Sequence, residues 1–321
     1  AVKNDLTKHL GVLGAGGGLQ INADSLDNSN AGKILSESAL NLRVNRVLDN
    51  RNNGLISAGN TLQLQAVDVD NRGGSLTGKQ RVALTSTTLD NRGARLTAGG
   101  DLQLRVDQLD NRQQGLVNAQ GALDFQGTLL NNQQGVLGAV GPLYLQVKTL
   151  DNTGGRISSS ADLTAYADRL SQQYGKLMAL GNLSLFGTHL DNQSGGLIGA
   201  TKALKLNVDV LDNRGGEISA GANIDVSGTQ LDNSNQGKVL AGSDLGLQVT
   251  RVINQAQGLL RGKGAVLLKG QHLDNTQGQL LGQQSVNIDL SAELDNTRGK
   301  LASTGSLLLN SGAALINQEG V

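Results

Sequence analysis

One short pattern returns along the whole chain: an apolar residue, most often followed by aspartate, and a side-chain amide two positions after the apolar residue. The pattern occurs fifteen times, at intervals of 20 to 22 residues. Its apolar members are Leu26, Leu48, Val69, Leu89, Leu109, Leu130, Leu150, Leu170, Leu190, Leu211, Leu231, Ile253, Leu273, Leu294 and Ile316. The amide is asparagine in twelve copies and glutamine in three, at Gln172, Gln255 and Gln318. A period of this length predicts stacked coils, each contacting its neighbours, in place of a conventional globular domain.

Within each copy, apolar and polar residues alternate, as is typical of strands with one buried face. In the copy that starts at Leu89, residues 95–98 alternate, two glycines follow, and residues 102–106 alternate again. The first inward aliphatic residue is followed six positions later by the next one in every copy, as from Leu96 to Leu102. No segment has the spacing of an amphipathic helix. The sequence therefore predicts an all-β fold, a parallel β-helix of about 15 coils with roughly 20–22 residues per coil.

Differences in repeat length are confined to two places, which we interpret as the corners of the coil. One lies between the amide and a Gly-x-aliphatic triplet that opens the first strand in fourteen of fifteen copies, with Ala94 as the exception. The other lies just before the apolar-Asp-amide step. A one-residue slip inside a strand would turn its buried face to water, whereas a corner absorbs it. The competing solenoid is a leucine-rich repeat, which needs a helical return segment, and here the return alternates like a strand.

Composition excludes several classes of function. The chain has 27 basic and 27 acidic residues, so it lacks the basic excess that attracts nucleic acid or an anionic membrane. It has no cysteine, which excludes disulfides and thiolate metal sites. No apolar run approaches the roughly 18 residues of a spanning helix. We expect no nucleic-acid partner, no membrane insertion, no cofactor and a monomeric state.

Both ends of the sequence are in phase with the repeat. Leu6, Leu13 and Leu19 already follow the pattern, and Gly320 opens another copy. Solenoids usually finish in atypical capping repeats with a polar outer face, and no such repeat is evident here. We expect residues 1–321 to form a single β-helical repeat domain that is an internal fragment of a longer filament.

The amide positions predict a buried ladder, because stacked asparagines can donate to and accept from one another. Replacing an interior member by leucine should cost about 1–3 kcal/mol, the usual penalty for an unsatisfied buried group. The ladder that we predict comprises Asn50, Asn71, Asn91, Asn111, Asn132 and Asn152.

Aspartate precedes the amide in eleven copies, and like charges one coil apart should face water. Four consecutive copies place arginine two residues after the aspartate, at Arg51, Arg72, Arg92 and Arg112. A row of calcium sites is the functional interpretation of this column. Arginine beside each carboxylate opposes cation binding, so the pattern favours a solvated row of ion pairs. The aspartates are Asp27, Asp49, Asp70, Asp90, Asp110, Asp151, Asp191, Asp212, Asp232, Asp274 and Asp295.

No catalytic motif emerges, and we predict no catalytic or metal site. The histidines are His9, His189 and His272, and the last two hold equivalent positions four coils apart, too far to share a metal. The chain has no nucleophile elbow and no phosphate-binding loop. Enzymatic β-helices wall off a substrate cleft with long loops, and the near-uniform coils here leave no room for such loops. A polysaccharide-active β-helix is therefore the weakest alternative.

All five aromatic residues lie between positions 125 and 186. Alternation predicts that Phe125 points inward and that Tyr144, Tyr166 and Phe186 point outward, the last two in the same column of adjacent coils. Exposed aromatics can simply pack along a sheet face. They can also form a patch that contacts a partner, so Tyr144, Tyr166 and Phe186 are a candidate partner patch.

The copies resemble the filamentous haemagglutinin repeat, in which Leu-Asp-Asn precedes Gly-x-Ile/Leu, as in residues 211–218 (LDNRGGEI). The resemblance covers the whole chain. It implies a right-handed β-helical filament from a large exoprotein of a Gram-negative two-partner secretion system, exported through an outer-membrane transporter. Such exoproteins include adhesins and contact-dependent growth inhibition toxins, secreted virulence factors that reach a target-cell surface through other segments.

The hypothesis that follows is a structural stalk, on the cell surface, that presents a distal adhesin or toxin domain. The alternative is that the shaft itself adheres to glycan or protein through the aromatic patch. The residues alone do not distinguish an adhesin parent from a toxin parent.

Overall fold

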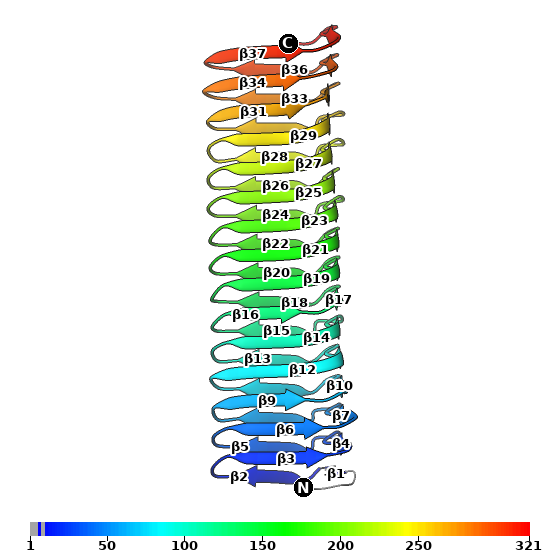
Figure 1. Ribbon diagram of the computed structural model, residues 1–321, viewed down its shortest axis with the longest axis vertical. Helices are drawn as coiled ribbons and strands as arrows, with labels where there is room; N and C mark the ends of the chain where they lie inside the picture. Colours follow the sequence, from blue (N-terminus) through cyan, green and yellow to red (C-terminus); the bar gives the residue numbers. More distant parts are fainter. Residues whose placement is uncertain (1–5, 8–9) are drawn as a thin grey trace. The chain divides into compact units, whose positions relative to one another are not determined.

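The computed structural model describes residues 6–7 and 10–321, and that part of the chain consists of strands and turns without helix. The predicted fold is confirmed: the chain is a parallel β-solenoid of about 15 turns with about 21 residues each. Internal contacts divide it into a first unit, residues 1–161, and a second unit, residues 162–321. In each unit every turn contributes one four-residue strand to a narrow sheet and longer or paired strands to a wide sheet (Figure 1).

The strands of the first unit run from β1 to β20. Its narrow sheet contains β2 (Val12–Ala15), β5 (Lys33–Ser36), β8 (Leu55–Ala58), β11 (Ser75–Gly78), β13 (Arg95–Ala98), β15 (Leu116–Ala119), β18 (Val136–Ala139) and β20 (Arg156–Ser159). Its wide sheet contains β1 (Leu6–Thr7), β3 (Leu19–Ala23), β4 (Leu26–Asp27), β6 (Leu40–Val44), β7 (Val47–Asp49), β9 (Thr61–Gln65), β10 (Asp68–Asp70), β12 (Arg81–Asp90), β14 (Leu102–Asp110), β16 (Leu123–Gln126), β17 (Leu129–Asn131) and β19 (Leu143–Asp151).

The second unit repeats this arrangement. Its narrow sheet contains β22 (Lys176–Ala179), β24 (Leu197–Ala200), β26 (Glu217–Ala220), β28 (Lys238–Ala241), β30 (Leu259–Gly262), β33 (Gln279–Gly282) and β36 (Lys300–Ser303). Its wide sheet contains β21 (Leu163–Ser171), β23 (Leu183–Asp191), β25 (Leu204–Asp212), β27 (Ile224–Asp232), β29 (Leu245–Ile253), β31 (Ala265–Gly270), β32 (His272–Asp274), β34 (Ser285–Leu290), β35 (Leu294–Asp295), β37 (Ser306–Ser311) and β38 (Leu315–Ile316).

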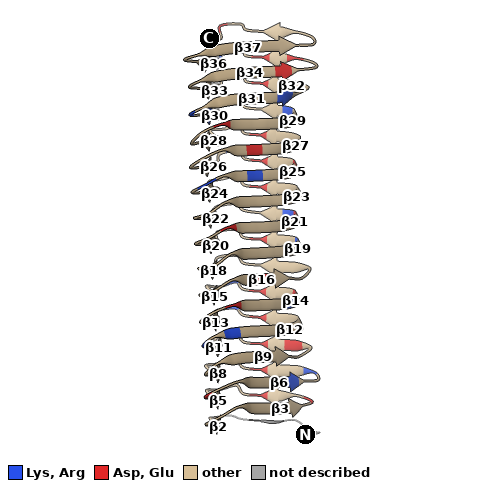
Figure 2. Ribbon diagram, turned by 60° about the vertical axis from the view of Figure 1, so that its left-hand side comes forward, with Lys and Arg blue, Asp and Glu red and all other residues tan. Residues whose placement is uncertain are grey.

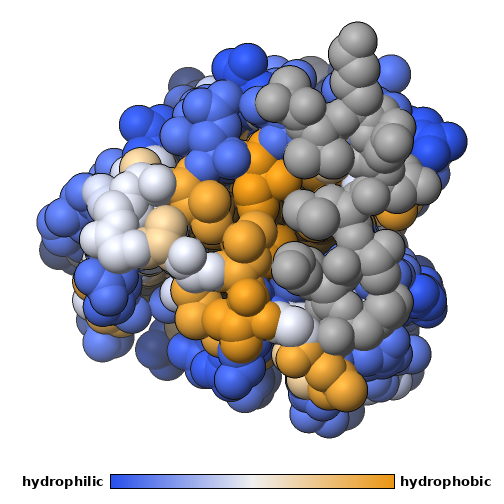
Figure 3. Space-filling view, turned by 90° about the horizontal axis from the view of Figure 1, so that it is seen from below, coloured by the Kyte–Doolittle hydropathy of each residue, from blue (hydrophilic) through white to orange (hydrophobic). Residues whose placement is uncertain are grey.

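Equivalent residues of successive turns pair in parallel, so identical columns form the core. In the narrow sheet Leu76 pairs with Ile56 and with Leu96, and all three are fully buried. In the wide sheet Leu102 lies between Val82 and Leu123. Viewed from the N-terminal end, hydrophobic side chains fill the centre and hydrophilic ones surround them (Figure 3). The six-residue spacing predicted from the sequence thus leads from a core residue of the narrow sheet, such as Leu96, to the first core residue of the wide sheet, Leu102.

The predicted corners are confirmed, and the corner after the amide absorbs insertions through left-handed residues. In the short corner after Asn71, a single residue, Gly73, has a positive φ of 64°. In the longer corner after Asn50, both Asn52 and Asn53 do, with φ of 52° and 64°. One extra left-handed residue therefore accommodates the insertion, and this explains why asparagine, glutamine and glycine predominate there.

A glycine opens the narrow strand in every described turn except that of Ala94, and it packs closely against the amide ladder. A Cβ atom on Gly135 would lie 2.1 Å from the carbonyl oxygen of Asn111 and 2.7 Å from Oδ1 of Asn132. Real Cβ atoms do not approach backbone oxygens so closely. The repeated Gly-x-aliphatic triplet is therefore a packing requirement of the neighbouring buried column.

Two copies of the pattern were aligned incorrectly from the sequence. Val252, not Ile253, pairs with Leu231, so Asn254 and not Gln255 occupies the amide column. Likewise Leu315 pairs with Leu294. Asn317, not Gln318, therefore takes the amide position of that turn. Both of these turns have two adjacent apolar residues, and the second of the two takes the outward position that aspartate holds in other turns.

Candidate functional site

The predicted amide ladder is present, and it is continuous in the first unit. Each Asn Nδ2 donates to Oδ1 of the asparagine in the next turn, at 2.7 or 2.8 Å. The asparagine side chains of the ladder are fully buried. Their Nδ2 atoms also donate to backbone carbonyls, as from Asn50 to Gly54 O at 3.0 Å. Because all donors point the same way, the bonds polarise one another. The members are Asn28, Asn50, Asn71, Asn91, Asn111, Asn132 and Asn152.

The ladder of the second unit begins with a defect at Gln172. Its Nε2 donates to Leu197 O at 3.3 Å, the same kind of carbonyl that the asparagines reach. Oδ1 of Asn192, however, is buried without a hydrogen-bond partner among the described residues. From there the ladder continues through Asn213, Asn233, Asn254, Asn275, Asn296 and Asn317, with bonds of 2.6 to 2.8 Å.

The Asp–Arg row of the first unit is a network of ion pairs, as the sequence predicted. Arg72 binds Asp70 through two nitrogens, with Nη2 2.6 Å from Oδ2, and its Nε lies 3.5 Å from Asp90 of the next turn. Arg51, Arg92 and Arg112 bind the aspartate two residues before them in the same way. Each guanidinium therefore neutralises its own turn, and those of Arg51, Arg72 and Arg92 also reach the aspartate of the next turn.

The ion pairs shift the pKa values of the row. Partial burial raises the pKa of the Asp49 and Asp90 carboxyls, but hydrogen bonds from Arg51 and Arg92 outweigh it, so both pKa values fall below the usual range. The hydrogen bond to Asp70 raises the pKa of Arg72. The carboxylates of Asp49 and Asp90 therefore stay ionised at neutral pH. Each carboxylate of the row is already paired with an arginine, which makes it a poor calcium ligand.

The second unit compensates its aspartates differently. Arg214 repeats the arginine geometry, with Nη2 2.6 Å from Asp212 Oδ2. Elsewhere an amide reaches from the preceding turn, as Gln173 Nε2 does to Asp191 Oδ2 at 2.6 Å. Positive and negative residues are interspersed along the turns of each unit (Figure 2).

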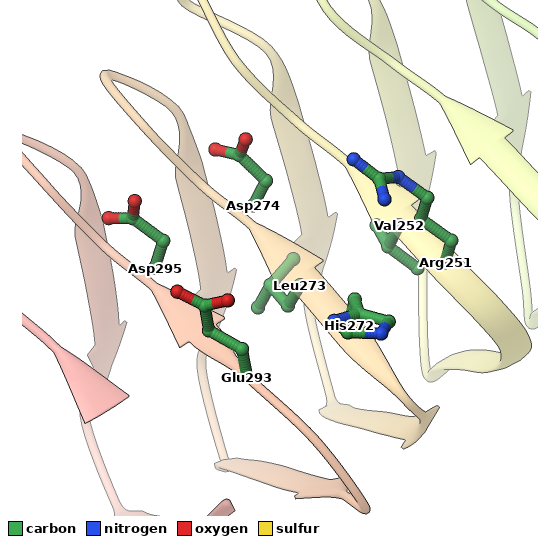
Figure 4. A pocket seen from close by; sticks show the side chains of 7 residues that line it. All are labelled: Arg251, Val252, His272, Leu273, Asp274, Glu293 and Asp295. Atoms are coloured by element: carbon green, nitrogen blue, oxygen red, sulfur yellow. The ribbon is translucent and has the colours of Figure 1, made fainter. Parts of the chain in front are cut away.

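The two histidines that the structure describes lie far apart. His189 and His272 hold the same column four turns apart in the second unit, and His9 lies outside the described residues. His272 lines a small depression with Glu293, Asp274 and Asp295 (Figure 4). Among the residues that the structure describes, no group of three or more histidine, aspartate or glutamate side chains is arranged to hold a metal ion.

Two of the three candidate patch residues lie together. Tyr166 and Phe186 stack in adjacent turns, with ring centroids 4.7 Å apart and an angle of 11° between the ring planes. Tyr166 is 41% exposed, whereas Phe125 is fully buried, as alternation predicted. Tyr144 belongs to the first unit, where its hydroxyl donates to Oε1 of Gln146 at 3.1 Å.

The structure also contains a groove that the sequence analysis missed. Residues at two outward columns of the wide sheet line it over four turns of the first unit, and its volume is about 530 Å³. From the sequence, only clefts walled off by long loops were considered. Here the outward side chains of successive turns make the walls, and no feature of the repeat signals them. The lining residues are Gln65, Ala66, Val67, Thr85, Ser86, Thr87, Arg105, Asp107, Gln126, Gly127 and Thr128.

A search of the described residues finds no helix with the length and hydropathy needed to cross a membrane. A family model for the haemagglutinin repeat matches residues 3–49, 39–106, 102–165, 167–234 and 227–320, which together span almost the whole chain. No curated protein and no solved structure matches the chain.

Proposed function

Because this chain belongs to the haemagglutinin repeat family, we propose that it is a stalk segment of a secreted exoprotein, a spacer that holds a distal adhesin or toxin domain away from the cell. Proteins with these repeats are typically secreted surface adhesins. The proposal places this chain on the surface of a Gram-negative bacterium, as an internal part of a longer filament.

The observation that carries the proposal is the uniformity of the turns within each unit. Insertions are confined to corners, so the strands of successive described turns stay in register. Each added turn extends a solenoid by one strand spacing, about 4.8 Å. A chain that repeats one turn without elaboration is suited to setting a length.

The partner during export is, in this proposal, an outer-membrane transporter of the two-partner type. The absence of cysteine suits a chain that crosses the envelope unfolded, because no disulfide can form on the way. Turns fold onto their predecessors, so folding outside the cell could pull the remaining chain outward. Scrambling the sequence of two interior turns should then stall export of the parent protein, and unchanged export would remove this step.

A length series tests the stalk role. Deleting residues 72–152 joins Asn71 to Thr153 and removes four whole turns, as the column from Asn71 to Asn152 shows. The deletion should shorten the reach of the parent by about 19 Å, four strand spacings, without unfolding the remainder. Adhesion or growth inhibition should fall as turns are removed and recover when they are added back.

The matched control removes residues 72–142, which joins Asn71 to Leu143 out of phase and should prevent folding. Activity that does not depend on the number of in-phase turns would contradict the spacer role.

A second candidate function is adhesion through the aromatic pair. The stacked rings of Tyr166 and Phe186 cover one face of each other, and Tyr166 remains 41% exposed. Tyr166→Ala and Phe186→Ala should abolish capture of a protein or glycan partner without lowering stability if the pair is a contact site. Unchanged capture in a glycan array and pull-down would leave it as a packing feature of the sheet.

A further inference from the structure

We propose that the groove of the first unit binds a neutral, linear polysaccharide that lies along the stack of turns. The proposal does not depend on the stalk role, because it rests on the lining of this groove alone.

The groove runs across the strands, along the direction in which the turns stack. One wall is a column of paired residues, in which Thr85 pairs with Gln65 and with Arg105, and Arg105 pairs with Gln126. The other wall follows two positions later, where Thr87 N donates to Val67 O and Thr128 N donates to Asp107 O.

Between the two walls lies an inward column with small side chains at three of the four turns. These are Ala66, Ser86 and Gly127, all of which contribute to the lining. At Gly127 a Cβ atom would lie 1.9 Å from Val106 O, so the backbone there admits no side chain. Because this column points toward the core, the floor between the walls is backbone, and the space above it is open to a ligand.

The walls present hydrogen-bonding groups that the protein itself does not use. The side chains of Gln65, Thr85, Thr87 and Thr128 make no hydrogen bond within the described part of the chain, and three of these four are threonine hydroxyls. Hydroxyls and amides that both donate and accept match the hydroxyl groups of a sugar. Val67, 46% exposed, adds an apolar surface for the C–H face of a ring.

The charge of the groove favours a neutral ligand over an anionic one. Its one cation, Arg105, lies 2.5 Å from Asp124 Oδ2 and also donates to Leu104 O at 3.1 Å, so it is already paired and held in place. Asp107 adds a negative charge to the opposite wall. An acidic polysaccharide would meet this carboxylate without an unpaired arginine to compensate it.

A peptide ligand fits the groove poorly. A peptide adds to a sheet through unpaired backbone groups at an edge, and the amides at this bend are already bonded. Ala66 N donates to Thr85 O at 3.1 Å, and Gly127 N donates to Gln146 O at 3.0 Å. Recognition must therefore use side chains that repeat about every 4.8 Å, close to the length of one sugar unit in an extended chain.

The test uses the complete chain and a panel of neutral hexasaccharides, cellohexaose, xylohexaose, mannohexaose and maltohexaose, measured by calorimetry and by NMR of the threonine methyl groups. We expect at least one to bind, with shifts at Thr85, Thr87 and Thr128. Affinity should rise from the disaccharide to the tetrasaccharide and then level off, because the groove spans four turns. Hexagalacturonate, the anionic comparison, should bind at least tenfold more weakly.

The matched variants replace hydroxyls by methyl groups of similar shape. Thr85→Val with Thr87→Val should weaken binding at least tenfold, as expected for two lost hydrogen bonds. Thr201→Val with Thr250→Val removes two exposed hydroxyls from the second unit and should leave affinity unchanged. Valine suits strands, so both proteins should fold, which circular dichroism checks.

Three results would overturn the proposal. They are the absence of binding to every neutral hexasaccharide, tighter binding of hexagalacturonate, and full affinity in the Thr85→Val, Thr87→Val protein.

Discussion

The amide column and the aspartate column are adjacent in every turn, yet they differ in how much variation they tolerate. The asparagines of the first unit are fully buried, and none is replaced. Next to them, the aspartates are compensated by arginine in some turns, by glutamine in others and by threonine in one, as at Asp295. A buried ladder fixes the residue because each member must satisfy two neighbours, whereas water satisfies whatever an exposed partner leaves unpaired.

The largest effect should come from breaking the buried column. Asn91→Leu would leave Nδ2 of Asn71 without its acceptor and Oδ1 of Asn111 without its donor. We expect a loss of about 3 kcal/mol in the free energy of unfolding, the upper end for buried unsatisfied groups. Urea unfolding measures the loss, and hydrogen exchange should show it concentrated in the turns next to residue 91.

A neutral outcome for Asn91→Leu would mean that the ladder bonds contribute nothing net, and the contrast between the columns would fail. Asn207→Leu, at an exposed position of strand β25, is the control for added apolar surface.

The glycine that faces the ladder should be the next most sensitive position. Gly135→Ala would place Cβ 2.1 Å from Asn111 O, a backbone atom that cannot move without disturbing the strand. We expect a loss of about 2 kcal/mol, in the range for overpacking a core. Thermal unfolding checks this.

The turn of Ala94 already carries a Cβ atom at the position that glycine holds in the other turns, so it provides the comparison. Ala94→Gly should change stability by no more than about 1 kcal/mol, the usual difference between the two residues in a strand. If Gly135→Ala is equally mild, the repeated glycine has a reason other than the ladder.

The defect at Gln172 should respond in the opposite direction. Gln172→Asn would place a donor at the ladder position below Asn192, whose Oδ1 has no partner among the described residues. We expect a gain of about 1 kcal/mol, that of one hydrogen bond. Urea unfolding measures the gain, and Gln230→Asn, at a half-buried strand position of the same unit, is the control.

Most of the fold could be predicted from the sequence, because every turn of a solenoid repeats the same pattern of apolar and polar residues. The strands, corners, core columns and ladder all follow from alternation and spacing. The alignment of the repeat was wrong by one residue at Val252–Asn254 and Leu315–Asn317, because two successive apolar residues fit the pattern in two ways. In the last turn, an amide at Gln318 would lie only two positions before Gly320, whereas the amide precedes the glycine by three or four positions in other turns. This spacing could have identified Asn317 as the member of the amide column.

The groove could not be predicted in the same way. Its lining depends on how the outward side chains of four turns are placed side by side, which alternation does not encode. The interactions of Gln172 likewise depend on the length of one side chain in a fixed cavity. Features that vary between turns are the ones that repetition cannot reveal.

The smallest effect should come from the exposed column, and it should depend on pH. The pKa of Asp90 is lowered in the folded state, because hydrogen bonds from Arg92 outweigh the effect of partial burial. A carboxyl whose pKa falls on folding stabilises the protein above its unfolded pKa of about 3.9, and this contribution is lost as pH falls through the folded value.

Arg92→Gln should therefore cost only about 0.2–1 kcal/mol at neutral pH, the usual value of an exposed ion pair. The difference from the unmodified protein should shrink as the pH falls below about 4 and vanish once Asp90 is protonated in both. NMR titration of the Asp90 carboxyl should show its pKa moving back upward in the variant, while Arg95→Gln, three positions along the same turn, leaves it unmoved. A cost for Arg92→Gln as large as that for Asn91→Leu would show that the aspartate column is as demanding as the ladder, because exposure would then not explain why its partners vary.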